Sequence, residues 1–229
     1  MKRPLLGGLA LMSLLTPTEA LALGPVDLGV SVLAVGGYNA IDKGSSPSFS
    51  SGSQRLEYPG FGGTSLGGGL ALEARVLGIV GVEVDGVFSR DVGDGKIGAT
   101  TVTIGQRAVH VPVLLKGVVP LPGVRPFVLV GPEFVLPLPS KAESDPPGEI
   151  RAVVGTERYT LVTAGLGAEV KLPLPGVDLR ASLSLRGSYR TGSSAELADR
   201  VTPLPSGALI LDGRWRYQAL LGASFGIFF

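Results

Sequence analysis

The sequence predicts an all-β fold: an eight-stranded antiparallel up-and-down transmembrane β-barrel with short periplasmic turns and long extracellular loops. Three observations predict it. Large apolar residues alternate with small or polar ones in one segment after another, as in a sheet with two different faces. The chain holds 35 glycines and only 17% charged residues, a composition that favours a sheet surrounded by lipid over a soluble helical domain. The last segment ends on an aromatic residue, Phe229.

The N-terminus has the pattern of a signal peptide. Lys2 and Arg3 precede an apolar run, Leu5–Leu15, that is too short to span a bilayer, and Ala20-Leu21-Ala22 forms a small-x-small cleavage site. We therefore expect residues 1–22 to be removed and residues 23–229 to form one barrel domain. Removal leaves 18 of the 20 basic and 18 of the 19 acidic residues, and this balance disfavours nucleic acid as a partner.

Four strands are expected in the N-terminal half, over residues 26–38, 66–76, 82–89 and 102–116. In the first, Val30 and Val32 share one face while Ser31 lies on the other. The second and third are joined by a short turn and carry charge on their polar faces. The fourth is less regular, but Val109 and Val111 oppose His110.

Four further strands are expected over residues 124–136, 160–172, 178–190 and 215–229. The alternation is cleanest in the third of these, where Leu183 and Leu185 oppose arginines. A register shift of one residue would turn those arginines into the lipid. Short connections are expected at residues 77–81, 117–123 and 173–177, and long loops at 39–65, 91–101, 137–158 and 191–213.

The polar strand faces place charges of both signs in the predicted lumen. An eight-stranded barrel has an interior just wide enough for side chains to fill, so opposite charges are expected to pair there. The predicted lumen network consists of Glu73, Arg75, Glu83, Asp85, Lys116, Glu133, Glu169, Lys171, Asp178, Arg180, Arg186, Arg190 and Arg216. Such a network indicates a rigid polar plug. A small selective pore, or a pocket for an anion, is the alternative.

The sequence indicates no catalytic site, no cofactor and no metal. His110 is the only histidine and there is no cysteine, so neither a typical metal-ligand set nor a thiolate nucleophile is available. A Ser-His-acid hydrolase needs a serine beside the histidine, whereas the chain reads His110-Val111-Pro112. A lipid-modifying barrel enzyme that uses a serine from another strand is the alternative. A secreted lipocalin-like carrier would need an apolar interior and a polar exterior.

Aromatic residues are expected at both ends of the last strand and in the first long loop. Tyr217, Phe225, Ile227 and Phe229 share the apolar face of the last strand. Its terminal aromatic residue resembles the C-terminal sorting signal of outer-membrane barrels, which implies recognition by the barrel-assembly machinery. The aromatic residues expected in interfacial girdles are Trp215, Tyr217, Phe225, Phe228 and Phe229. The loop aromatics are Phe49, Tyr58 and Phe61. They are expected to pack within the loop, and a role as binding anchors is the alternative.

Two consecutive segments resemble a known family. Val109–Lys116, followed by Arg125–Pro132, is similar to a recurring hairpin of the small eight-stranded outer-membrane β-barrel family, which includes OmpX and the OmpA transmembrane domain. Together with the terminal strand, the resemblance covers nearly all of residues 23–229. It implies a non-enzymatic integral protein of the cell outer membrane that contacts outer-membrane lipid. It indicates no particular extracellular partner.

Overall fold

The computed structural model describes residues 26–42, 48–51, 54–57, 59–145, 147, 152–191, 201–203 and 209–229. The predicted signal peptide, residues 1–22, lies outside the described residues. Tyr58 and the side chain of Phe49 do as well. No helix in the described part of the chain is long and apolar enough to cross a membrane.

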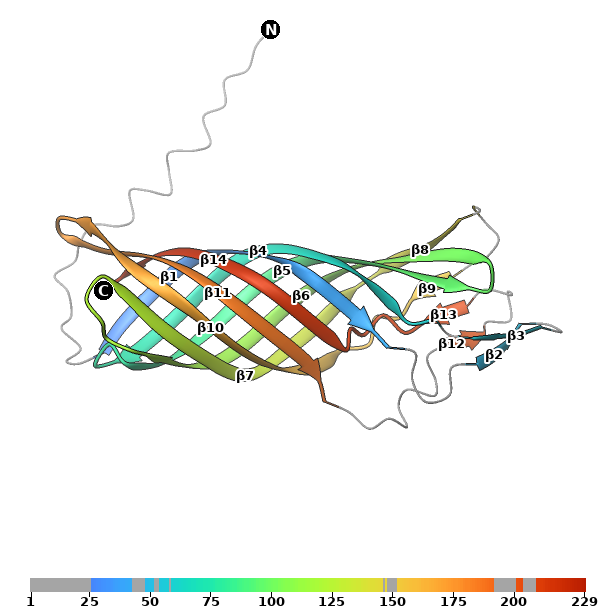
Figure 1. The fold of residues 1–229 in the computed structure, drawn as a ribbon, viewed down its shortest axis with the longest axis horizontal. Helices are drawn as coiled ribbons and strands as arrows, with labels where there is room; N and C mark the ends of the chain where they lie inside the picture. Colours follow the sequence, from blue (N-terminus) through green and yellow to red (C-terminus); the bar gives the residue numbers. More distant parts are fainter. Residues whose placement is uncertain are drawn as a thin grey trace, which may run out of the picture.

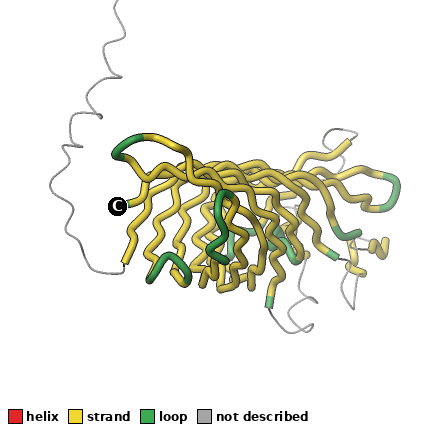
Figure 2. Tube along the Cα trace, turned by 60° about the vertical axis from the view of Figure 1, so that its left-hand side comes forward, coloured by secondary structure: helices red, strands yellow, loops and turns green. Residues whose placement is uncertain are grey.

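Eight long antiparallel strands form a closed ring, as predicted (Figures 1 and 2). They are β1 (Val26–Ile41), β4 (Phe61–Val76), β5 (Val80–Ile97), β6 (Thr100–Val118), β7 (Val124–Leu138), β10 (Tyr159–Leu174), β11 (Val177–Arg190) and β14 (Tyr217–Phe228). Each strand pairs with the next one in this order, and β1 pairs with β14 to close the ring. The arrangement is therefore an up-and-down barrel with no free edge.

The two ends of the barrel differ. At the turn end, residues 77–79, 119–123 and 175–176 connect neighbouring strands, and Phe229 pairs with the backbone of Leu28. Gly123 and Gly176 have φ values of 82° and 78° there, which glycine adopts without steric cost. At the loop end lie the short strands β2 (Ser48–Ser51), β3 (Gln54–Glu57), β8 (Ser140–Asp145), β9 (Ala152–Val154), β12 (Val201–Pro203) and β13 (Leu209–Leu211) (Figure 1).

Several predicted boundaries were wrong at the loop end. The expected loop over 91–101 is instead the tip of the β5–β6 hairpin, whose pairing continues to Ile97 opposite Thr100. Threonines and valines continue the alternation through this tip, and Gly98, with φ 63°, forms the turn. The loop expected over 137–158 contains β8, which extends the sheet beside β6, and β9.

The strand faces agree with the predicted alternation. Outward apolar residues are highly exposed, and Leu66, Leu70, Val128 and Leu183 each expose more than half of their surface. The intervening positions face the interior and are mostly buried, as the burial pattern of β6 shows. The barrel therefore has an apolar exterior and an interior rich in polar groups, the reverse of a soluble protein.

Candidate functional site in the barrel lumen

The interior contains three layers. Nearest the turn end lies a group of paired charges, which we call the charged cluster: Glu73, Arg75, Glu83, Asp85, Lys116, Arg125, Glu169, Arg180 and Arg186. Next comes a network centred on His110, and apolar side chains fill the loop end. Six barrel strands contribute to the charged cluster, so its geometry depends on the closed ring.

Arg75 is the most buried member of the charged cluster, with no exposed surface. Its two terminal nitrogens donate to both oxygens of Glu169 at 2.7 and 2.9 Å, and its Nε donates to Glu73 at 2.7 Å. The guanidinium thus makes a bidentate contact across the lumen, from β4 to β10, which is the strongest geometry for such a pair. Arg125 Nη2 also lies 2.8 Å from Glu169.

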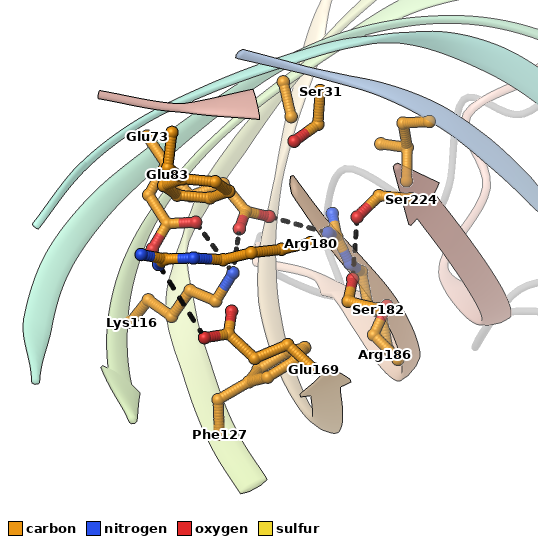
Figure 3. Close-up of a pocket in the computed structure, with 14 residues that line it drawn as sticks. Ser31, Glu73, Glu83, Lys116, Phe127, Glu169, Arg180, Ser182, Arg186 and Ser224 are labelled. Atoms are coloured by element: carbon orange, nitrogen blue, oxygen red, sulfur yellow. Dashed lines mark hydrogen bonds and ion pairs between the residues drawn. The ribbon is translucent and has the colours of Figure 1, made fainter. Parts of the chain in front are cut away.

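Lys116 joins two carboxylates that would otherwise repel. Glu73 and Glu83 lie directly opposite each other on β4 and β5, an arrangement that is unfavourable without a cation. Lys116 Nζ donates to Glu73 at 3.0 Å and to Glu83 at 2.7 Å. Figure 3 shows these side chains pointing toward one another from separate strands. Arg186 then links Glu83, at 2.8 Å, to Asp85.

Two buried aromatic rings cover the cations of the cluster. Lys116 Nζ lies 4.4 Å from the centre of the Phe127 ring, and the Arg180 guanidinium lies 3.9 Å from that of Phe228. These distances are within the range of cation–π attraction. The sequence predicts Phe228 in an interfacial girdle, and this prediction is wrong. Phe228 points inward instead, because it sits one position out of phase with the exposed Phe229.

Two residues of the predicted network lie at the turn-end mouth. The Lys171 side chain is 59% exposed and that of Asp178 is 25% exposed, and they pair with each other at 3.1 Å. Asp178 also accepts hydrogen bonds from Arg180. Lys171 has inward parity but lies near the end of β10, where the lumen opens, so its amine reaches water.

The middle layer holds His110 between two carboxylates. His110 Nδ1 lies 2.6 Å from Glu133 Oε1, and its Nε2 lies 3.6 Å from Asp91 Oδ2. Both carboxylates also accept hydrogen bonds from hydroxyl groups. Ser65 and Ser89 donate to Asp91, and Thr163 and Ser188 donate to Glu133. This network accounts for the buried histidine, since it lies between two carboxylates that each accept further hydrogen bonds from hydroxyl groups.

This geometry does not form a Ser-His nucleophile. A nucleophilic serine donates its proton to the imidazole, whereas Ser65, Ser89 and Ser188 all donate to carboxylates. His110 is also only 5% exposed, inside the closed ring. Within the described residues, no group of three or more histidine, cysteine or acidic side chains is placed to hold a metal ion.

The loop end is filled by an apolar cap that the strand alternation does not predict. Its members are Ile41, Phe61, Ile97, Val102, Ile104, Ala108, Val135, Val154, Tyr159, Leu161, Leu211 and Trp215. Trp215 is completely buried at its centre, so its expected place in an interfacial girdle was wrong. A signal was present, because Ile104 and Leu161 are large apolar residues at inward positions. Smaller apolar groups also lie between the polar residues of the lumen, namely Leu114, Val118, Phe127 and Leu129, and Leu33, Val35 and Val87.

The two remaining network residues lie at the loop end, away from the charged cluster. Arg190 Nη1 lies 3.5 Å from Asp212 Oδ2. Arg216 does not enter the lumen: it donates to the Tyr189 hydroxyl at 3.0 Å and lies 3.4 Å from Asp42. It precedes β14 in an irregular segment, so the alternation that predicted an inward direction does not apply.

The cavities found in the lumen are small. One lies in the charged cluster (Figure 3) and another beside His110 and Glu133, and each measures about 20 Å³. Such a volume has room for about one water molecule. These two cavities therefore have room for single water molecules among the paired side chains, and not for a larger ligand.

Comparison with family models and with curated proteins gives no match. Solved structures of small outer-membrane barrels are similar in fold. Neisserial surface protein A is 8% identical, with 90% of this chain and 96% of that chain covered and a TM-score of 0.42. The N-terminal barrel domain of OprF from Pseudomonas aeruginosa is 14% identical (86% and 96% covered, TM-score 0.35). OprG from the same organism is 12% identical (87% and 95% covered, TM-score 0.39).

Proposed function

We propose that this protein is a non-enzymatic integral protein of the outer membrane whose lumen is plugged. The observation that carries the proposal is the inverted barrel: exposed apolar side chains surround a closed ring that buries charged pairs. A β-barrel satisfies all of its strand hydrogen bonds internally, so it can cross hydrocarbon. The loop-end strands then face the exterior and serve as the surface for interactions or envelope structure.

The plug consists of two different parts. The charged cluster and the His110 network fill the turn half and the middle with hydrogen-bonded side chains, and the apolar cap closes the loop end around Trp215. An ion that entered would have to break buried ion pairs and then cross an apolar layer. Both steps are unfavourable, so the arrangement supports a plug over the alternative of a selective pore.

The last strand is the proposed contact with the barrel-assembly machinery. Tyr217, Phe225 and Phe229 are 45%, 47% and 65% exposed on its outward face, with the partly buried Ile227 between the two phenylalanines. These side chains are therefore available to a binding partner. Outer-membrane lipid is the proposed partner of the same face once the barrel is inserted.

The test is reconstitution of the purified barrel into lipid vesicles and planar bilayers. We expect the boiled and the unboiled protein to migrate differently on a gel, because boiling unfolds the barrel. We also expect protection of the barrel strands from protease, and conductance no higher than that of the lipid alone. Failure to insert would refute the membrane assignment. Reproducible single-channel steps would refute the plug while leaving the membrane assignment intact.

A further inference from the structure

Two arginine side chains lie next to each other on the outward face of the barrel, and the described residues offer neither of them an ion pair. Arg90 on β5 and Arg107 on β6 lie directly opposite each other, and both are exposed. Among the residues that the structure describes, no carboxylate forms an ion pair with either of them. Like charges placed opposite each other across two strands are destabilising, so this pair favours an anion between its side chains.

The pair lies at the boundary of the apolar band. Ten residues separate Val80, at the turn end of β5, from Arg90, and ten separate Gly117 from Arg107 on β6. At a rise of about 3.3 Å per residue and a tilt of about 40°, ten residues span roughly 25 Å, the height of the apolar band of such barrels. Below the arginines the outward face is apolar, with Phe88 and Val109 next in line.

Tyrosines occupy the same level on other strands. Tyr38, Tyr189 and Tyr217 each lie ten residues along their strand from a turn-end residue of the same parity, namely Leu28, Leu179 and Ile227. Of these three, Leu28 is exposed, Ile227 is partly buried and Leu179 is buried. Tyrosine at this level marks the interface between hydrocarbon and headgroups. On β5 and β6 two arginines take that place, so the barrel presents its cations where lipid phosphates lie.

The flanking residues fit a lipid. Leu66 pairs with Arg90 on one side, and Leu138 pairs with Arg107 on the other. Both leucines are exposed, at 72% and 38%. An outward carboxylate on the same strand, Asp94, is four residues further out and accepts a hydrogen bond from Thr103 at 2.6 Å. The cations are therefore bordered by apolar surface and separated from that acidic group.

We propose that Arg90 and Arg107 form a binding site for the phosphate of a lipid headgroup, with the acyl chains lying along Leu66 and Phe88. Two guanidinium groups side by side can bind one phosphate through several charge-assisted hydrogen bonds. The inference rests on the proposed insertion into a membrane. It assigns a headgroup class to the lipid that surrounds this side of the barrel.

The experiment measures binding of phosphatidic acid to the full barrel in a nonionic detergent by native mass spectrometry. Arg90→Gln/Arg107→Gln is compared with wild type and with Lys96→Gln/Arg158→Gln, which removes two exposed positive charges elsewhere. We expect about thirtyfold weaker binding in the first variant, since each interfacial cation contributes about fivefold and the two contributions multiply. The control should stay within about twofold of wild type.

Two further arms identify the source of the phosphate. Diacylglycerol with the same acyl chains should bind no better to wild type than to the arginine variant, and excess inorganic phosphate should not displace phosphatidic acid. Equal binding by wild type and the arginine variant would overturn the site. So would binding of diacylglycerol as tight as that of phosphatidic acid, displacement by inorganic phosphate, or self-association of the barrel through this face. Protease protection in vesicles, measured on the same samples, separates these outcomes from failure of membrane insertion.

Discussion

Replacement of Arg75 by methionine tests whether the charged cluster holds the barrel together. The change keeps an unbranched side chain of similar length but removes three hydrogen bonds, two to Glu169 and one to Glu73. Loss of one partner from a buried ion pair costs about 3–5 kcal/mol, because the remaining charge stays desolvated. Here Glu169 keeps Arg125 and Glu73 keeps Lys116, so we expect a value near the lower end, about 3 kcal/mol.

The assay is unfolding by denaturant in lipid vesicles, followed by the fluorescence of Trp215, the single tryptophan and a completely buried one. A double-mutant cycle with Glu169→Met isolates the pair. We expect the double variant to be about 2 kcal/mol more stable than the sum of the single effects predicts. The reason is that Glu169→Met removes the buried carboxylate that Arg75→Met leaves without its partner. Lys171→Met is the matched control, since the Lys171 side chain is 59% exposed, and it should cost less than about 1 kcal/mol.

The reasoning would be refuted by a small effect of Arg75→Met, below about 1 kcal/mol, or by strictly additive single variants. Either result would mean that water already solvates the cluster. The unfolding slope with denaturant must stay the same across the series for the comparison to hold, because a changed slope would signal a different unfolded or native ensemble.

Three further predictions concern the cap, the lipid face and a strand glycine. Trp215→Ala should lower the free energy of unfolding by about 3–5 kcal/mol, as for large-to-small changes in a core. The measurement is the temperature at which the folded, compact band disappears on a gel. An unchanged midpoint temperature would contradict the buried cap. Leu70→Arg, about 15 Å along the band from the turn end, should cost about 2–4 kcal/mol in vesicles, whereas Thr64→Arg near the loop end should cost at most about 1 kcal/mol. Gly69→Val should reduce the folded yield on refolding, because a Cβ at residue 69 would overlap the carbonyl of Gly86, while Gly105→Val, with open space around it, should refold as wild type.

The two faces of the sheet were predictable from the sequence because the alternation has a physical cause at every position. A residue of a closed barrel contacts either the exterior or the interior, and successive residues alternate between them. Leu183 and Leu185 against Arg180 and Arg186 therefore gave both the strand and its orientation. The end of a strand is not set by this alternation. Pairing in the β5–β6 hairpin therefore continues to Ile97 and Thr100, through a segment whose composition is typical of a loop.

Burial in the lumen was harder to predict because it depends on contacts between strands far apart in the sequence. Glu73, Glu83 and Lys116 could be assigned to the interior, but which cation meets which carboxylate follows from the register of the ring. Trp215 and Arg216 lie outside regular pairing, so parity could not orient them. Trp215 lies in the apolar cap, and Arg216 contacts the hydroxyl group of Tyr189 outside the lumen.

The pairing of β1 with β14 has a consequence for how this chain reaches its final shape. These two neighbours are separated by nearly the full described sequence, and twelve residue pairs join them, from Gly29 opposite Phe228 to Ala40 opposite Tyr217. A chain interrupted before residue 217 would keep two unsatisfied strand edges, each able to recruit another copy. Release of the finished molecule into the bilayer must therefore wait for the arrival of its last segment.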